Sequence, residues 1–482
     1  MIGCDIGTQS SKGVLVDAEG KIRASASADH RVDFPAPGHA QQDPSEWISA
    51  LSQILPRLAA AAEGEITHIG IAAQLDGVVA VDSNLSPLHP ALIWMDRRST
   101  AQTEQIRNQV GPERVFEITG LNCDSSHAAP KMSWLREKID EDIDGFLPVG
   151  TFVNAWLTGA IVQDPANASS TMLYDVNESD WSDELLEVSG FGRKALAPVQ
   201  QSTQVIGRIQ TGLADELGVS PQIEVVTGTG DDHASGIGAG AVRAGVIADV
   251  AGTAEPIGTT SINAVFDPGR LVETHAHALE EKWFIENPGF VSGGSIRWIA
   301  GLLDIDQSEV FRLAGAAKPG VKGMTFIPAL SGAMSPRWND YMRGSFTGIS
   351  MDHGSAELCR AVIEGCTFAL RDTVDRIAEM SLPVDRIHVT GGGAASDLWL
   401  QMKADVAGVP VHRVVTEGAP IGAACLAAVA AGWYSDTESA SDSLVEVHPD
   451  PFEPNSAMAG VYGDAYRRYR DLFDALEPVF QP

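Results

Sequence analysis

The chain has 482 residues, of which 44% are hydrophobic and 20% charged, and its formal net charge at pH 7 is −31. This length predicts two domains, and this composition is typical of a globular protein with a large core. The excess of Asp and Glu repels nucleic acid and anionic membrane surfaces, so neither is expected as a partner.

The first residues predict two strands with a glycine turn between them. The apolar run Ile2–Asp5 and the segment Gly13–Val16 have strand character, and Gly7-Thr8 lies between them. A helix is expected next, because Asp43 is a typical N-cap and Pro44 a typical first helical residue.

Pro56 interrupts the apolar pattern of this helix and is expected to kink or shorten it. A short buried strand over residues 67–73 follows and ends at Gln74-Leu75-Asp76-Gly77. The order strand, helix, strand indicates an α/β layer architecture.

The second half of the chain repeats this opening. A strand-like run over residues 223–227 leads to Asp231, and another, over residues 246–250, leads to Gly252-Thr253. A third run, over residues 387–390, precedes Gly391-Gly392-Gly393. The domain boundary is expected near residues 240–245, where small residues could also serve as a hinge. Helices are expected over residues 355–378, 394–406 and 459–476.

The glycine turns at Gly7, Gly252 and Gly391 all follow apolar strands. Glycine lets a backbone approach a ligand closely, and successive exposed N–H groups in such turns bind anions. Two Gly-Thr turns half a chain apart therefore predict two related domains that bind one polyphosphate between them. The spacing matches neither the dinucleotide-binding fingerprint after the first strand nor the P-loop.

Two aspartates at strand ends are candidates for phosphoryl-transfer chemistry. Asp5 could hold Mg²⁺, and Asp231 could take the proton of a substrate hydroxyl as it attacks phosphorus. Either residue could instead only cap its turn. Lys12 could reach a phosphate, although a solvated hairpin lysine is the simpler interpretation.

The segment Ile93–Arg98 combines a flat apolar side chain, Trp94, with the charges of Asp96 and Arg98. Sugars are bound by such combinations of stacking and bidentate polar groups. The alternative is a buried tryptophan beside a structural Asp96–Arg98 ion pair.

The cysteines predict a reduced, cytoplasmic protein. The five cysteines are scattered, and no C-x-x-C pair occurs among them, which argues against a disulfide framework or a zinc site. No signal peptide is expected, because no basic segment precedes an apolar stretch at the N-terminus. The longest apolar run, over residues 421–433, is too short to span a bilayer.

In chain order these landmarks resemble the FGGY carbohydrate kinases of the actin/hexokinase/Hsp70 ATPase superfamily, over essentially the whole length. The matching segments are Asp5–Thr8, Trp94–Arg98, Pro130–Leu135, Gly230–Asp232, Gly252-Thr253, Gly344–Gly365, Gly391–Ser396 and Gly418–Ala424. The segment 344–365 is the most specific of them, because its spacing fits the family signature throughout.

The resemblance implies an α/β fold of two ribonuclease-H-like domains around a central cleft, and it leaves a homodimer possible. Residues 1–242 are expected to bind mainly the sugar and residues 243–482 mainly ATP with Mg²⁺. By the match, Asp231 is the catalytic base, and Asp5 and Asp231 lie beside the metal. The residues expected to contact the sugar are Gln74, Leu75, Asp76, Trp94, Asp96, Arg98 and Asp232. Those expected to contact ATP are Gly7, Thr8, Gln9, Lys12, Gly252, Thr253, Gly392, Gly393, Ala394 and Ser396.

Within the family the chain is most similar to xylulokinases, which implies transfer of the γ-phosphoryl group of ATP to a terminal hydroxyl of a ketopentose, D-xylulose first. Xylulokinases usually carry Met-His in the segment that here reads Gln74-Leu75-Asp76-Gly77, and Asn where this chain has Asp232. A kinase of ribulose, erythritol or glycerol is therefore an alternative. A non-catalytic, actin-like nucleotide-binding protein is a further one, which would need neither Asp231 nor a polar sugar cleft.

Overall fold

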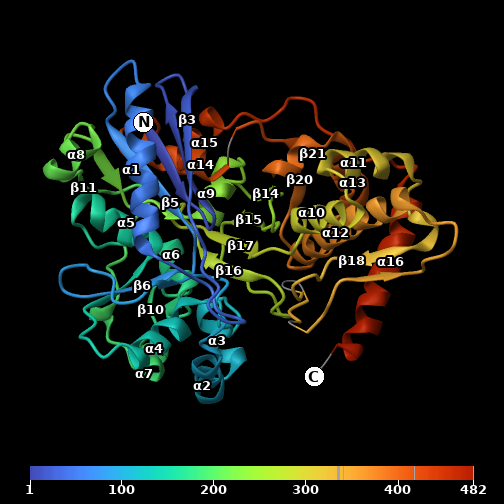
Figure 1. Ribbon diagram of the computed structural model, residues 1–482, viewed down its shortest axis with the longest axis horizontal. Coiled ribbons are helices and arrows are strands. Elements are labelled where there is room, and N and C mark those ends of the chain that lie inside the picture. Colours follow the sequence, from blue (N-terminus) through green and yellow to red (C-terminus); the bar gives the residue numbers. More distant parts are fainter. Residues whose placement is uncertain (334–336, 340, 417, 481–482) are drawn as a thin grey trace.

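Each half of the chain builds one large β-sheet (Figure 1). The computed structural model describes residues 1–333, 337–339, 341–416 and 418–480. The strands of the first sheet are β1 (Ile2–Ile6), β2 (Ser10–Val16), β3 (Ile22–Asp29), β5 (His68–Ala73), β11 (Val205–Arg208), β12 (Glu224–Val226) and β13 (Thr229–Gly230). Their order is β11-β12-β5-β1-β2-β3, and β13 also pairs with β5.

The second sheet is built from the second half of the chain. Its strands are β14 (Gly245–Val250), β15 (Ile257–Ser261), β16 (Glu273–Ala276), β17 (Trp283–Asn287), β20 (Val384–Thr390) and β21 (Val411–Arg413). Their order is β16-β17-β15-β14-β20-β21, which makes β16 an edge strand.

The two sheets share one strand plan. In the first, β1, β2 and β3 are antiparallel neighbours, and β5 and β12 continue the sheet in parallel on the other side of β1. In the second, β14, β15 and β17 are antiparallel, and β20 and β21 continue in parallel beside β14. This repeated plan confirms the expected α/β architecture with two related halves.

Helices and shorter strands surround these sheets. The helices are α1 (Pro44–Ala60), α2 (Thr100–Val110), α3 (Pro112–Thr119), α4 (Ala128–Lys138), α5 (Val149–Thr158), α6 (Pro165–Ser170), α7 (Asp183–Ser189), α8 (Thr211–Leu217), α9 (Asp231–Gly238), α10 (Gly293–Leu303), α11 (Gln307–Ala316), α12 (Ser355–Glu379), α13 (Asp397–Ala407), α14 (Gly418–Ala430), α15 (Thr437–Leu444) and α16 (Ala459–Leu476). The 3₁₀ turns are η1 (Arg193–Ala195), η2 (Val321–Gly323), η3 (Gly392–Ala395) and η4 (Glu477–Val479). The smaller sheets contain β4 (Gln41–Gln42), β6 (Val78–Val81), β7 (Ala91–Leu92), β8 (Gly145–Pro148), β9 (Tyr174–Asp175), β10 (Asp180–Trp181), β18 (Thr325–Ile327) and β19 (Ser345–Thr347).

Local signals placed most of the predicted helices well. Asp43 caps α1 by accepting a hydrogen bond from the Ser45 N–H, as expected of an N-cap residue. Pro56 was expected to kink or shorten α1, and the shortening is wrong, because the helix continues through it to Ala60. Its buried face includes Trp47, Leu51, Ile54 and Leu58, and this packing outweighs the one missing backbone hydrogen bond.

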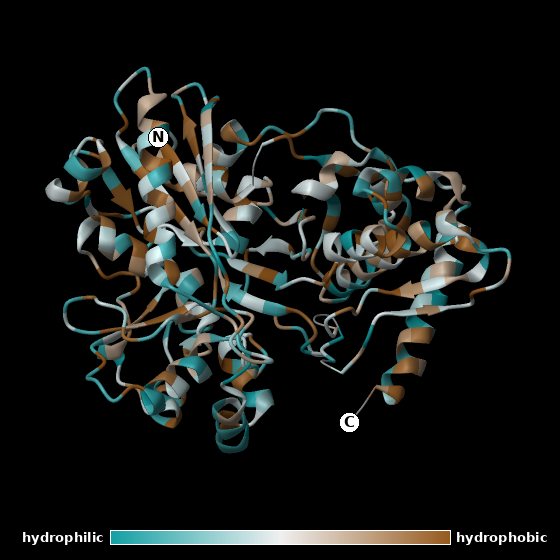
Figure 2. Ribbon diagram, in the orientation of Figure 1, coloured by the Kyte–Doolittle hydropathy of each residue, from teal (hydrophilic) through white to brown (hydrophobic). Residues whose placement is uncertain are grey.

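The hydrophobic residues of both halves concentrate on the sheets and on the helix faces that cover them. In Figure 2 several strands of the first half have the hydrophobic colour, the strands near the middle of the molecule carry both colours, and α1 and α16 alternate between them along their length. The aromatic residues Tyr462, Tyr469 and Phe473 of α16 pack inward. Those side chains are therefore core residues of the second half.

The five cysteines are buried free thiols, in agreement with the absence of a disulfide framework. Within the described ranges, no helix combines the length and the apolar character needed to cross a bilayer.

Helix α14 comes from the second half of the chain but packs on the first sheet. A Cβ atom added to Gly3 of β1 would lie 2.0 Å from the Pro420 carbonyl oxygen, and one added to Gly70 of β5 would lie 2.1 Å from the Ala423 oxygen. On its other side, Gly422 approaches the Ala234 oxygen of α9 equally closely. Glycine at these positions lets α14 wedge between β1, β5 and α9.

We expect Gly70→Ala to lower the free energy of unfolding by about 1–3 kcal/mol, because a methyl group would force α14 away from β5. The urea midpoint measures this change. Gly64→Ala is the matched control, since nothing lies within 4 Å of a Cβ at that exposed position. Equal urea midpoints for the two variants would mean that α14 can move away from β5 without a loss in the free energy of unfolding.

Candidate functional site

A cavity of about 300 Å³ lies where the ends of elements from both sheets converge. It is lined by Asp5, Thr8, Leu75, Asp76, Trp94, Ser126, His127, Asp231, Asp232, Ser235, Val250, Ala254, Pro256, Glu273, His275, Glu286, Pro288, Trp338 and Ala419. A larger groove of about 1020 Å³ is lined by another set, including Trp181, Ile262 and Trp283, to which no predicted site residue in the described ranges belongs. The smaller cavity is the candidate site, because the ionisable side chains converge on it.

Asp231 is the first residue of α9 and is held by backbone donors. Its Oδ1 accepts hydrogen bonds from the N–H groups of Leu75 and Asp232, each at 3.2 Å. The Leu75 contact joins residues far apart in the chain. Burial raises the pKa of Asp231 to about 6, although the backbone N–H groups oppose that rise. A carboxylate with this pKa is largely ionised at neutral pH and can still accept a proton.

Asp232 and Glu286 are two further carboxyl groups that line the cavity. Burial and then the charge of Asp231 raise the pKa of Asp232 well above its usual value, and burial and then Asp232 do the same for Glu286. The interaction between the two carboxyl groups lowers the pKa of Asp232 and raises that of Glu286. A protonated carboxyl group can donate a hydrogen bond as well as accept one.

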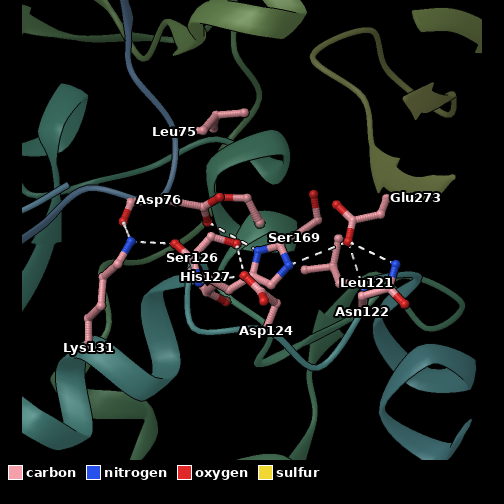
Figure 3. Close-up of polar contacts among 12 residues, drawn as sticks. Leu75, Asp76, Leu121, Asn122, Asp124, Ser126, His127, Lys131, Ser169 and Glu273 are labelled. Atoms are coloured by element: carbon pink, nitrogen blue, oxygen red, sulfur yellow. Dashed lines mark hydrogen bonds and ion pairs between the residues drawn. The ribbon is translucent and has the colours of Figure 1, made fainter. Parts of the chain in front are cut away.

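His127 links carboxylates from the two halves of the chain (Figure 3). Its Nδ1 lies 3.4 Å from Asp76 Oδ1, and its Nε2 lies 3.5 Å from Glu273 Oε1. Burial alone would lower the pKa of His127, but Asp76 and Glu273 raise it to about 10. The imidazolium is therefore charged at neutral pH and offsets part of the negative charge of the cavity.

The backbone at Asp76 is fixed by a buried lysine. Lys131 of α4 is fully buried and donates hydrogen bonds to the carbonyl oxygens of Asp76, at 2.8 Å, and of Ser126 (Figure 3). Asp76 itself adopts a left-handed backbone with φ 60°. That conformation is uncommon for a residue other than glycine, and Lys131 holds the loop in it.

The first glycine turn borders the cavity through Thr8 and Trp94. The Trp94 indole N–H donates to Thr8 Oγ1 at 3.0 Å. Gln74 is buried behind the turn, where its amide donates to Gln42 Oε1 at 2.7 Å and to the Gly7 carbonyl oxygen at 3.4 Å. Gln74 therefore supports the turn from behind and is not among the residues that line the cavity.

Asp96 and Arg98 pair with each other away from the cavity. Arg98 Nε lies 2.8 Å from Asp96 Oδ2, and its guanidinium stacks on Trp134. Asp96 also accepts a 2.7 Å hydrogen bond from the Ala40 N–H. Of the two interpretations of this segment, the structural ion pair fits Asp96 and Arg98, whereas Trp94 does line the cavity.

The second glycine turn adjoins the cavity through its flanking residues. Val250 and Ala254 line the cavity on either side of Gly252-Thr253. The Gly252 N–H bonds within the turn to the Ala254 oxygen, and Thr253 Oγ1 accepts a hydrogen bond from Arg297 at 2.8 Å. The turn is thus closed and rigid.

The third glycine turn packs against the second. The Gly393 N–H donates to the Ala251 oxygen at 2.9 Å, and Gly393 and Ala394 are buried. Gly392 is exposed, with open space where a Cβ would lie. Ser396 caps α13 by accepting the Trp399 N–H. The two turns therefore form one continuous backbone surface.

The remaining predicted ATP contacts lie on the first hairpin. Lys12 is an exposed residue of β2 directly opposite Asp5 in the strand register, so the two side chains share a face of the sheet. Gln9 is exposed in the turn, and its carbonyl oxygen accepts the His30 N–H at 3.0 Å. The Gly7 N–H is used to close the hairpin, by bonding to the Ser10 oxygen.

Sequence reasoning missed the part of the site that β16 and β17 supply. Glu273, His275 and Glu286 line the cavity, and all three are buried. A signal was present, because Glu273, His275 and His277 alternate with Thr274 and Ala276. Titratable side chains at every second position of a strand point to one face, which is unusual for a buried strand.

The carboxylates of Asp5 and Asp231 are chemically suited to Mg²⁺, which commonly uses one or two protein carboxylates together with phosphate and water oxygens. Both residues line the cavity. Over the described residues, no group of three or more His, Cys, Asp and Glu side chains is arranged to hold a metal ion by itself. Any Mg²⁺ would therefore depend on phosphate oxygens for much of its coordination.

Comparison with known proteins identifies what this architecture is similar to. Residues 1–238 match the N-terminal domain, and residues 248–431 the C-terminal domain, of the FGGY family of carbohydrate kinases. The chain is 30% identical to the xylulose kinase of Staphylococcus epidermidis, over 99% of this chain and 96% of that one.

Two solved structures extend the comparison to the fold. A ligand-bound xylulose kinase from Lactobacillus acidophilus matches with a TM-score of 0.94 at 25% identity, covering 99% of this chain and 98% of that one. A gluconate kinase from the same organism matches with a TM-score of 0.94 at 26% identity and the same coverage. Both likenesses extend over the whole molecule.

Proposed function

We propose that this chain, which belongs to the FGGY family of carbohydrate kinases, phosphorylates a terminal hydroxyl of a neutral ketopentose, with D-xylulose as the first candidate. As a member of that family it has the ribonuclease-H-like fold and is an ATP-dependent sugar phosphotransferase. The substrate is the open question, because relatives of equal structural likeness include a xylulose kinase and a gluconate kinase.

The observation that carries the proposal is the position of Asp231. It lies at the start of α9 in the cavity, its Oδ1 is fixed by two backbone N–H groups, and its pKa is raised to about 6. We assign it as the general base that accepts the proton of the attacking hydroxyl. Leu75, Asp76, Trp94 and Asp232 would then contact the sugar around it.

We assign ATP to the opposite side of the cavity. The exposed Gly392 and the joined turns at Gly252-Thr253 and Gly391–Ser396 offer a backbone surface on which a nucleotide could lie. Asp5 and Asp231 would hold Mg²⁺ between the phosphates and the sugar, where the ion would neutralise charge on the transferred phosphoryl group. Lys12, opposite Asp5 in register, would face the same phosphates.

We further propose that residues 1–242 and 243–482 act as two domains that close on the substrates. Gly240 lies in the connection between α9 and β14, and Gly245 is the first residue of β14; their φ angles are 76° and 92°. These left-handed conformations favour glycine, and the short segment is suited to a hinge. Closure would exclude water and limit hydrolysis of ATP.

The charges of the cavity favour a neutral sugar over a sugar acid. Asp76, Asp232, Glu273 and Glu286 line it in addition to the assigned base, and the one imidazolium, His127, is already paired with two of them. A substrate carboxylate would meet repulsion and find His127 occupied. We therefore expect D-xylulose, or another neutral sugar or polyol, to be used in preference to gluconate.

Coupled ADP production with Mg·ATP tests this expectation against D-xylulose, ribulose, erythritol, glycerol and gluconate. We expect the kcat/KM for at least one neutral substrate to exceed that for gluconate by about tenfold or more, which corresponds to about 1.4 kcal/mol. Faster turnover of gluconate would refute the charge argument. No sugar-dependent ADP release with any substrate would favour the non-catalytic alternative.

A further inference from the structure

The edge of the second sheet forms one wall of the cavity. β16 and β17 are antiparallel, with Glu273 directly opposite Glu286 and His275 directly opposite Phe284. Because side chains alternate along a strand, Glu273, His275 and Glu286 share one face of this two-stranded ribbon. Figure 1 shows β16 and β17 near the middle of the molecule, where they reach toward the first half. We call this face, made by Glu273, His275 and Glu286, the β16–β17 wall.

His275 is buried and makes no hydrogen bond within the described residues, although its Nε2 lies 3.8 Å from Glu273 Oε2. Its side chain is 3% exposed, it lines the cavity, and within the described residues neither ring nitrogen has a hydrogen-bond partner. Burial lowers the pKa of His275, so the ring is neutral and offers one N–H donor and one acceptor nitrogen. Buried polar groups nearly always find partners, so an unpaired one that faces a cavity points to a missing ligand.

The neighbouring histidine on the same strand face provides the contrast. His277 Nδ1 accepts a hydrogen bond from the Ala278 N–H at 2.8 Å, and its Nε2 lies 3.0 Å from Thr260 Oγ1. His277 is thus satisfied by the protein itself. The difference between the two rings is that only His275 borders the cavity with Asp231 and Asp232.

The two glutamates of the wall, Glu273 and Glu286, also lie directly opposite each other in the strand register. Two carboxyl groups directly opposite each other in a sheet are an unfavourable pair when both are charged. Glu273 is offset by His127 and by the Asn122 N–H, which donates to Oε1 at 2.9 Å. The Oε2 of Glu286 is buried and has no hydrogen-bond partner in the described residues. Fold stability alone does not explain this pair.

We propose that the β16–β17 wall binds hydroxyl groups of the sugar other than the one that is phosphorylated, with His275 and Glu286 as specificity-determining residues. This inference rests on the proposed function and makes it more definite. The N–H and the acceptor nitrogen of His275, together with the Glu286 carboxyl group, match the paired donors and acceptors of neighbouring hydroxyls on a neutral polyhydroxylated substrate. The second half of the chain would thereby contribute to sugar specificity as well as to ATP binding.

The test compares His275→Phe, His275→Gln and the control His277→Phe. Phenylalanine keeps the ring and removes both nitrogens, and glutamine keeps one donor and one acceptor. Sugar binding without ATP is followed by tryptophan fluorescence, since Trp94 and Trp338 line the cavity. Coupled ADP production then gives kcat and the KM values for sugar and ATP, and thermal unfolding gives Tm.

We expect His275→Phe to raise the dissociation constant and the KM for the sugar by about 5- to 100-fold, with the KM for ATP unchanged. Its Tm should be equal or higher, because two unpaired buried nitrogens are removed. His275→Gln should recover part of the sugar affinity. His277→Phe should show the opposite pattern, with a lower Tm and normal sugar affinity.

Unchanged sugar affinity in folded His275→Phe would overturn the proposal. Should that variant fail to fold, Glu286→Gln takes its place, and normal sugar affinity there would overturn the proposal equally. If the wild-type protein binds a sugar but transfers no phosphate, the proposed kinase function fails while the fluorescence titrations still decide the role of the wall. If it binds no sugar of the panel at all, both are overturned.

Discussion

Asp231→Asn is expected to lower kcat for sugar phosphorylation by about 10²- to 10⁴-fold, the usual contribution of a positioned general base. Asparagine has the same shape, and its side-chain oxygen can still accept the N–H groups of Leu75 and Asp232. Its amide cannot take the proton of the attacking hydroxyl. The loss should therefore appear in kcat, as measured by coupled ADP production.

The fold of this variant should remain intact. Burial raises the pKa of Asp231, which means that its charged form is disfavoured in the folded protein, so a neutral replacement should leave Tm equal or higher at neutral pH. Asp232→Asn is the informative comparison, because we expect that change to raise the KM for the sugar more than it lowers kcat. Substantial turnover by Asp231→Asn would place the base elsewhere.

Lys403→Met is expected to lower the free energy of unfolding by about 3–5 kcal/mol, the usual cost of removing one partner from a buried ion pair. Lys403 of α13 is fully buried, and its ammonium group contacts Asp249 of β14 and, at 2.8 Å, Glu255. Removing it would leave two buried carboxyl groups without a cation. Because these two residues flank the Gly252-Thr253 turn, the turn should also loosen, with a higher KM for ATP.

The pH dependence identifies the cause of this destabilisation. Burial and then Glu255 already raise the pKa of Asp249 to about 8. Lys403 lowers the pKa of Asp249 in the wild type, so in the variant this pKa should rise further. The deficit should therefore shrink as the pH falls from alkaline values to about 8 and change little below it. Urea unfolding at several pH values measures it, and a deficit that grows at low pH would contradict this account.

The matched control is an ion pair at the surface. Arg243 and Asp442 also join distant parts of the chain, but their side chains are 52% and 57% exposed. Arg243→Ala should therefore change the free energy of unfolding by less than about 1 kcal/mol. A similar loss from both variants would mean that burial contributes nothing to the cost at Lys403.

Most elements of the fold could be predicted from local sequence. The N-cap at Asp43, the strand runs before Gly7, Gly252 and Gly391, and the helix at 459–476 all depend on residues close together in the chain. The length of α1 could not be predicted in this way. The helix continues past Pro56 because its apolar face is buried, and local sequence does not show that packing.

The candidate site was predicted only in part, for the same reason. Asp5, Thr8, Leu75, Asp76, Trp94, Asp231 and Asp232 do meet in one cavity. Gln74, Asp96 and Arg98 do not line it. Gln74 is hydrogen-bonded to Gln42, and Asp96 and Arg98 form the ion pair that the sequence offered as the alternative. The glutamates and the histidine of the β16–β17 wall were missed. Their sequence does not show that the fold places them beside Asp231 and Asp232 in the cavity.

The sequence by itself determined the family, the alternation of strands and helices and the glycine turns. Each of these depends on patterns of residues that are close together in the chain. Only the tertiary structure decided which charged groups share the cavity, because that depends on contacts such as the Leu75–Asp231 hydrogen bond, whose partners are 156 residues apart. It also decided which buried side chains are hydrogen-bonded, as Lys403 is, and which have no hydrogen bond within the described residues, as is the case for His275. Pairing in a low-dielectric interior sets the energies on which both stability and substrate recognition depend.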